Sequence, residues 1–182
     1  GFEWAVSNDV KEVYFLDPSF NARPDLPALL KKLAHINKGH KLTLISEIRA
    51  DAVDDGLAAL LADAGFKWFE IGLQSTNKNV LQIMNRKTDL NRFLKGIEAL
   101  KKRGITTEID LILGLPGDDP EGFKNTLKFI TDNNLGDDIQ LFPLSILPGT
   151  VFRRDAERLG IIFDKNPPYT VLSTGRFTED EM

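Results

Sequence analysis

Short apolar runs alternate with longer amphipathic segments along most of this chain of 182 residues. The short runs have the length of strands, are rich in β-branched and aromatic residues, and mostly follow a glycine. They cover residues 11–16, 41–46, 68–73, 107–113 and 139–144. Strand–helix units that recur at intervals of roughly thirty residues are typical of parallel strands joined by right-handed crossovers. The pattern therefore predicts an α/β fold, either a doubly wound sheet or part of a barrel.

The segments between the runs carry the periodicity of helices. Apolar residues recur three and four positions apart in residues 26–36 and 53–64. Two further helical faces are marked by Phe93, Ile97, Leu100 and by Phe123, Leu127, Ile130. Such spacing places the apolar side chains on one side of each helix, where they can pack against a sheet. The stretch 166–182 breaks this rhythm, so we expect it to leave the repeating fold.

Composition excludes several classes of protein. The net charge of −4 argues against a dedicated nucleic-acid surface, which needs clustered Lys and Arg. No apolar run approaches the ~18 residues of a membrane span, and no signal-peptide pattern is present, so we expect a cytoplasmic protein without a membrane partner. With no cysteine, these residues cannot form disulfides or ligate an iron–sulfur cluster. His35 and His40 do not have the spacing of a metal pair, and we predict no metal ligand here.

Polar residues follow the predicted strands at the ends where parallel α/β folds bind ligands. Asp110 stands out because an ionised carboxylate inside an apolar strand costs several kcal/mol unless it is paired or ligated. Carboxylates, an amide and a cation at neighbouring strand ends suit a polar ligand with hydroxyls, an amine and a carboxylate. The candidate binding residues are Asp17, Glu47, Gln74, Arg86 and Asp110. No nucleophile with a base beside it is evident, so no catalytic residue is assigned.

Each candidate also has a purely structural interpretation. Asp17 before Pro18 is typical of a turn, and Glu47 could form a surface ion pair with its neighbour Arg49. Residues 74–76 and the aspartate at 118 could cap helices. Arg86 could be a solvated cation at a helix end.

Four sequence segments, in order, resemble a known superfamily. They are Glu70-Ile-Gly-Leu-Gln-Ser75, Leu81-Gln-Ile-Met-Asn-Arg86, Asp110-Leu-Ile-Leu-Gly-Leu-Pro-Gly117 and Ile146-Leu-Pro-Gly-Thr150. Together they resemble the radical S-adenosylmethionine (SAM) proteins, in particular the branch with oxygen-independent coproporphyrinogen oxidase, the methylthiotransferases and the cobalamin-binding enzymes. The resemblance implies a partial (β/α)6 TIM-like barrel. In that barrel the five predicted strands would be strands two to six, and the first strand would be lacking.

The resemblance also implies a role for each candidate residue. Glu47 and Gln74 match positions that contact SAM, Arg86 matches the arginine that pairs with its methionine carboxylate, and Asp110 matches the acid that takes ribose hydroxyls. Asp17 lies where many members bind the SAM amino group through Gly-Gly-Glu, although this chain has Leu-Asp-Pro there. Backbone near residues 113–114 and 144–145 would lie along the adenine.

The family holds a [4Fe–4S] cluster on three cysteines after the first barrel strand. It reductively cleaves SAM to a 5′-deoxyadenosyl radical that attacks a substrate. Because this chain has no cysteine, we expect a fragment, inactive alone, whose parent supplies the cluster ligands and uses an electron donor. Residues 1–165 would be the barrel core and 166–182 an extension. The segment that follows Arg153 resembles the cobalamin-binding branch, which implies a cobalamin domain in the parent.

Two other functions compete with this interpretation. A non-catalytic α/β binding module would account for the missing cysteines. A TIM-barrel lyase or isomerase could use Glu47 and Asp110 as acid and base, but that chemistry favours a Lys or His at a strand end, and none is present there.

Overall fold

The computed structural model describes all residues, 1–182. Five strands form one parallel sheet, in which their spatial order β1-β2-β3-β4-β5 is also their order along the chain. The strands are β1 (Glu12–Phe15), β2 (Thr43–Glu47), β3 (Phe66–Gln74), β4 (Thr106–Leu113) and β5 (Asp138–Pro143). Each overlaps one of the five predicted runs, so the predicted α/β class with parallel strands is confirmed.

The four predicted amphipathic segments are all helical. They form α2 (Leu26–Ile36), α3 (Asp55–Ala64), α5 (Leu90–Lys102) and α6 (Pro120–Asp132). The shorter elements were not predicted. They are α1 (Phe2–Ser7), α4 (Lys78–Ile83), α7 (Val151–Arg154), the 3-10 helices η1 (Phe20–Ala22), η2 (Ala50–Ala52) and η3 (Glu179–Glu181), and the antiparallel pair β6 (Ile162–Phe163) and β7 (Val171–Ser173). No helix has both the length and the apolar character that a bilayer crossing requires.

The chain divides into two compact units, and strands β3, β4 and β5 contribute to both. Unit 1 consists of Gly1–Gly72, Asp89–Ile109 and Leu135–Ile139. Unit 2 consists of Leu73–Thr88, Asp110–Asn134 and Gln140–Met182. Strands β3 and β4 each begin in unit 1 and end in unit 2, so the carboxyl ends of these two strands belong to unit 2.

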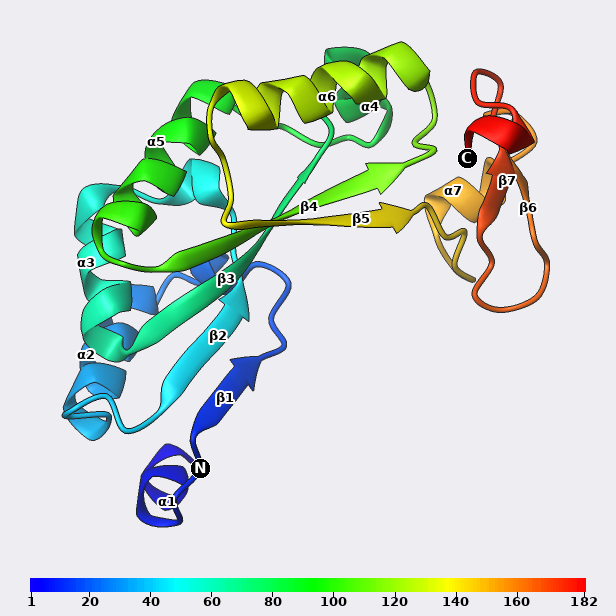
Figure 1. Ribbon diagram of the computed structural model, residues 1–182. Helices are drawn as coiled ribbons and strands as arrows, with labels where there is room; N and C mark the ends of the chain where they lie inside the picture. The colour runs from blue at the N-terminus through cyan, green and yellow to red at the C-terminus, as the bar shows by residue number, and fades with distance from the viewer. The chain divides into compact units, whose positions relative to one another are not determined.

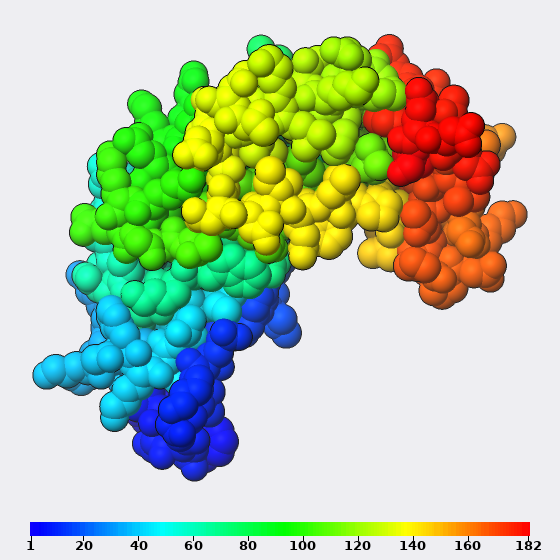
Figure 2. Space-filling model, in the orientation of Figure 1, coloured from blue at the N-terminus to red at the C-terminus, as the bar shows by residue number.

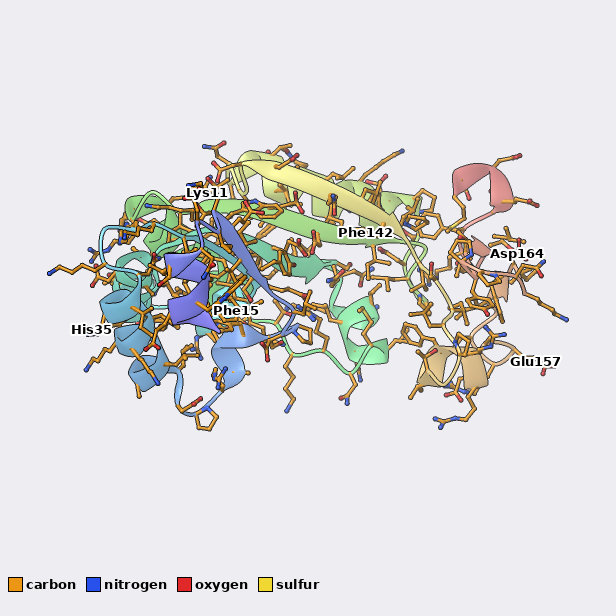
Figure 3. The ribbon with its side chains drawn as sticks, turned by 90° about the horizontal axis from the view of Figure 1, so that it is seen from below. Lys11, Phe15, His35, Phe142, Glu157 and Asp164 are labelled. Atoms are coloured by element: carbon orange, nitrogen blue, oxygen red, sulfur yellow. The ribbon has the colours of Figure 1, made fainter.

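Unit 1 is built around a stack of phenylalanine rings. Phe66 lies between Phe69, at 5.1 Å between ring centroids, and Phe20, at 5.2 Å. Phe15, labelled in Figure 3, joins the same cluster from β1 at 4.8 Å from the Phe20 ring. Helices α2, α3 and α5 lie side by side along this unit (Figure 1). The left-handed turn that ends α3 falls on Gly65, whose φ is 100°.

Unit 2 has a second, smaller core. Its buried apolar residues come from α4, the turn after β4, the segment after β5 and strand β7: Val80, Leu115, Leu144, Ile146, Ala156, Ile161 and Val171. The guanidinium of Arg153 lies over the rings of Phe163, at 5.1 Å, and Tyr169, at 4.7 Å, and donates a hydrogen bond of 2.8 Å to the Ile146 carbonyl. These contacts tie the β6–β7 hairpin to the rest of the unit.

Strand β5 is exposed along its whole length. Its yellow atoms lie at the surface in Figure 2, and Phe142, labelled in Figure 3, is 44% exposed. Ile139 and Leu141 are similarly uncovered. The edge of the sheet formed by β5 therefore contributes little to either core.

Candidate functional site

The candidate residues of unit 1 follow β1 and β2. Asp17 is exposed in the turn after β1, and Glu47 is the last, half-buried residue of β2. The loops after these two strands are joined through Asn21. Its side-chain oxygen accepts the Arg49 N–H at 3.0 Å and its amide donates to the Arg49 carbonyl at 2.8 Å. Asp17 and Glu47 therefore lie at the ends of two strands whose following loops are hydrogen-bonded to each other.

The other three candidates lie in unit 2. Gln74 is the last residue of β3, Arg86 follows α4, and Asp110 lies on β4 and is 8% exposed. Strands β3 and β4 are neighbours in the sheet, so their side chains can face a common ligand.

Gln74 has two unusual features. Its backbone φ is +69°, a left-handed conformation that costs a non-glycine residue roughly 1–2 kcal/mol. Its side-chain oxygen Oε1 is buried and has no hydrogen-bond partner. Since most buried polar atoms in proteins are hydrogen-bonded, an unpartnered oxygen beside a strained backbone marks a candidate ligand contact.

The turn after β4 brings backbone close to other parts of unit 2. Gly114 has a φ of +80°, and a Cβ at this position would lie 2.4 Å from the terminal methyl of Met182. The Leu144 N–H donates to the Leu113 carbonyl at 2.9 Å, which places the segment after β5 beside this turn. The two backbone stretches expected beside adenine are therefore hydrogen-bonded to each other.

Two polar residues of unit 2 were missed or misassigned by sequence reasoning. Thr88 has a buried hydroxyl without a partner, and only its position after Arg86 in a polar loop could have suggested it. Asp118, predicted as a possible helix cap, is 1% exposed and does not cap α6. The N-cap is Asp119, whose side chain accepts the Gly122 N–H at 2.8 Å. Two adjacent aspartates offer the same capping chemistry, so the sequence could not distinguish them.

The environment of Asp118 differs from that of an ordinary carboxylate. Burial raises the pKa of its carboxyl, and a hydrogen bond from the Asn77 side chain at 3.2 Å opposes that shift only in part. Its oxygen Oδ2 is buried without a partner. Asp118 is thus held close to the loop that follows Gln74.

Comparison with known proteins identifies the family. The Radical SAM superfamily profile matches residues 2–130. This chain belongs to the radical SAM superfamily. The resemblance to radical SAM proteins predicted from its four motifs is confirmed. The matching relatives include a coproporphyrinogen III oxidase and a tRNA methylthiotransferase.

Related sequences match most of this chain but only part of themselves. The uncharacterized protein MJ1620 of Methanocaldococcus jannaschii is 29% identical over 141 residues, which are 77% of this chain and 28% of that protein. Oxygen-independent coproporphyrinogen III oxidase of Salmonella typhimurium is 33% identical over 127 residues, 68% of this chain and 26% of that enzyme. The chain therefore spans less than a third of the length of these two curated relatives.

Solved structures share the fold. TsrM, a radical S-adenosylmethionine methyltransferase from Kitasatospora setae solved with cobalamin and a [4Fe–4S] cluster, aligns with a TM-score of 0.78 at 17% identity, over 92% of this chain and 36% of TsrM. The radical SAM coproporphyrinogen III oxidase HemN of Escherichia coli aligns with a TM-score of 0.69 at 23% identity, over 93% of this chain and 41% of HemN. Both likenesses extend beyond the sequence match into the C-terminal part of the chain.

Proposed function

We propose that this chain is the SAM-binding barrel of a radical SAM Fe–S oxidoreductase. The observation that carries the proposal is the buried, unpartnered Oε1 of Gln74, at the carboxyl end of a strand next to the one that holds Asp110. Oε1 can only accept a hydrogen bond, so it suits a ligand with an ammonium or hydroxyl donor. SAM has both, together with a carboxylate that a guanidinium can bind.

The proposed roles follow the chemistry of each side chain. Arg86 binds the methionine carboxylate of SAM, because a guanidinium can donate two parallel hydrogen bonds to it. Gln74 accepts a hydrogen bond from its polar groups, and Asp110 accepts from the ribose hydroxyls. For Glu47 and Asp17, which belong to unit 1, only the family resemblance supports a contact with SAM. The backbone at residues 113–114 and 144–145 borders the adenine.

The residues of this chain fit SAM but not the iron–sulfur cluster. The cluster needs cysteine thiolates, and the chain has none. We place the cluster ligands elsewhere in the parent protein and number the five strands as strands two to six of its partial barrel. SAM supplies a sulfonium whose one-electron reduction gives methionine and a 5′-deoxyadenosyl radical. The chain's own residues position SAM and shield it from water.

Further features of the parent protein belong to the same proposal. It acts in the cytoplasm on a substrate, with an electron donor as partner, and it carries a cobalamin domain before this barrel. Residues 1–165 form the barrel core and residues 166–182 an extension. This chain alone binds SAM weakly and has no activity, because the cluster that orients SAM is not among its groups.

The first test is the iron and sulfide content of the full-length protein, purified without oxygen. We expect about four irons and four sulfides per chain. Protein that holds no iron after reconstitution would overturn the radical SAM activity. The alternative, a non-catalytic α/β binding module, would then stand, since it predicts a parent protein without cluster-binding cysteines.

The second test measures SAM binding by calorimetry in the same protein. Arg86→Ala should raise the dissociation constant about 10- to 100-fold, because it removes charge-assisted hydrogen bonds worth roughly 1.5–3 kcal/mol. The matched control is Arg103→Ala, which removes an exposed arginine in unit 1 and should leave SAM binding unchanged. Equal SAM affinities for the two variants would remove Arg86 from the site.

A further inference from the structure

The loop that follows Gln74 needs a restraint. Gln74 itself lies in the left-handed region, and the next residue, Ser75, is 1% exposed and donates its N–H to the Leu73 carbonyl at 2.9 Å. A glutamine adopts this backbone only when surrounding contacts hold it there. These contacts must come from residues beyond the turn.

The first contact is a saturated hydroxyl on helix α6. Thr126 is fully buried, and its Oγ1 donates to the Gly122 carbonyl at 3.2 Å. The same oxygen accepts the Thr76 N–H at 3.1 Å and lies 2.9 Å from the Thr76 hydroxyl. Because the proton of Thr126 is used on Gly122, the Thr76 hydroxyl must be the donor of that bond. The single donor and both acceptor positions of the Thr126 hydroxyl are therefore occupied.

The second contact joins the next residue of the loop to the start of α6. The Asn77 side-chain amide donates to Oδ1 of Asp118 at 3.2 Å, and the Asn77 N–H donates to the Ser75 hydroxyl at 3.1 Å. Gly122 leaves space for this contact, since a Cβ there would lie 2.3 Å from Oδ1 of Asp118. The first turn of α6 is thus shaped to receive the loop.

We propose that Thr76, Asn77, Asp118 and Thr126 form a clamp that positions Gln74 for SAM. These four residues bind the loop after β3 to helix α6 and hold the Gln74 backbone in its left-handed conformation. They touch neither SAM nor the reacting atoms, so they are positioning residues. This inference rests on the proposed function, because it assumes that Gln74 contacts SAM.

The test replaces the saturated hydroxyl with a methyl group of the same shape. In the full-length protein, Thr126→Val should speed hydrogen exchange of the amides of residues 75–77 without SAM present. It should also raise the SAM dissociation constant about tenfold. Thr126→Ser, which keeps the hydroxyl, should restore both values toward those of the wild type.

The matched control is Thr131→Val on the same helix. The Thr131 hydroxyl is exposed and donates only to carbonyls of its own helix, at 3.0 Å and 3.3 Å. This substitution should change neither the exchange of the loop nor the affinity for SAM. If Thr126→Val fails to fold, Thr76→Val replaces it, since it removes the partner hydroxyl from the loop and leaves α6 intact.

The outcomes separate the clamp from the proposed function. Gln74→Ala with unchanged SAM affinity would overturn the role given to Gln74. Weaker binding in Gln74→Ala but unchanged binding in Thr126→Val and Thr76→Val would overturn the clamp alone. Unchanged exchange of residues 75–77 in both valine variants would also overturn it, whatever SAM does.

Discussion

The two units of this chain treat their buried polar groups differently. In unit 1, the buried Asn37 side chain is fully bonded: it donates to the carbonyls of Leu42 and Ala64 at 2.9 Å and 3.0 Å and accepts the Leu42 N–H at 2.9 Å. In unit 2, buried oxygens of Gln74, Thr88 and Asp118 have no partner. Natural proteins rarely leave such atoms unsatisfied without a functional reason.

This difference indicates that unit 1 contributes most of the stability and that unit 2 holds the groups able to bind a ligand. Unit 1 combines a ring stack, three helices packed side by side and satisfied polar groups, which is the composition of a scaffold. Unit 2 combines a smaller core with unpartnered oxygens, which lower stability and leave hydrogen-bonding capacity for a ligand. Measurements of the stability of variants in each unit can test this assignment.

The largest effect is expected in the ring stack of unit 1. Phe66 is fully buried between two other rings, so Phe66→Ala should lower the free energy of unfolding by about 3–5 kcal/mol through the cavity it leaves. The control, Phe142→Ala, removes the same ring from exposed β5 and should cost far less. Urea denaturation of both variants measures this. Similar losses would contradict the assignment of unit 1 as the scaffold.

Much of this scaffold was predictable from the sequence. Strand β3, which contains Phe66, is a largely apolar run, and helices α2, α3 and α5 carry long apolar periodicities, so tertiary packing reinforces what the local pattern favours. The β6–β7 hairpin was not predicted because strands of two and three residues are too short to show the alternation of apolar and polar residues. Helix α4 has only six residues, which is too short for its apolar positions to show a helical period.

The candidate site was predictable as a set of residue types but not as a geometry. Gln74 could be singled out because it ends an apolar strand, yet nothing in its residue type indicates a left-handed backbone, which favours glycine or asparagine. Likewise, Asp118 accepts a hydrogen bond from Asn77, which lies 41 positions away in the sequence. Contacts of this range are set by the fold, so a single sequence does not reveal them.

Removal of one buried hydroxyl should change the free energy of unfolding by about 1 kcal/mol, and the sign should differ between the two units. In unit 2, Thr88→Val removes an unpartnered oxygen and should stabilise the protein. In unit 1, Ser46→Ala removes a hydroxyl that donates to the Phe15 carbonyl at 3.2 Å, and should destabilise it. Thermal unfolding of both variants gives the signs. A loss of stability in Thr88→Val would mean that the hydroxyl is not unpartnered in solution.

The smallest effect is expected at Glu108, the buried carboxylate of unit 1. It departs from the pattern of satisfied buried polar groups in that unit. Glu108 is 6% exposed, and burial raises the pKa of its carboxyl, helped by the nearby charges of Glu70 and Asp138. A pKa raised on folding means that the folded protein binds this proton more tightly than the unfolded chain. The stability contributed by Glu108 therefore falls as the pH rises above the ordinary glutamate value of 4.5.

Glu108→Gln should consequently leave stability nearly unchanged at pH 4 and increase it progressively toward pH 8, as urea denaturation across that range would show. The control is Glu98→Gln. The hydrogen bond and charge of Lys102 lower the pKa of Glu98, so its contribution is present at neutral pH and lost on acidification. Removing that carboxylate should cost a little stability at pH 8 and nothing at low pH. If both variants show the same pH slope, Glu108 is hydrated in solution, and unit 1 has no buried carboxylate that departs from the scaffold pattern.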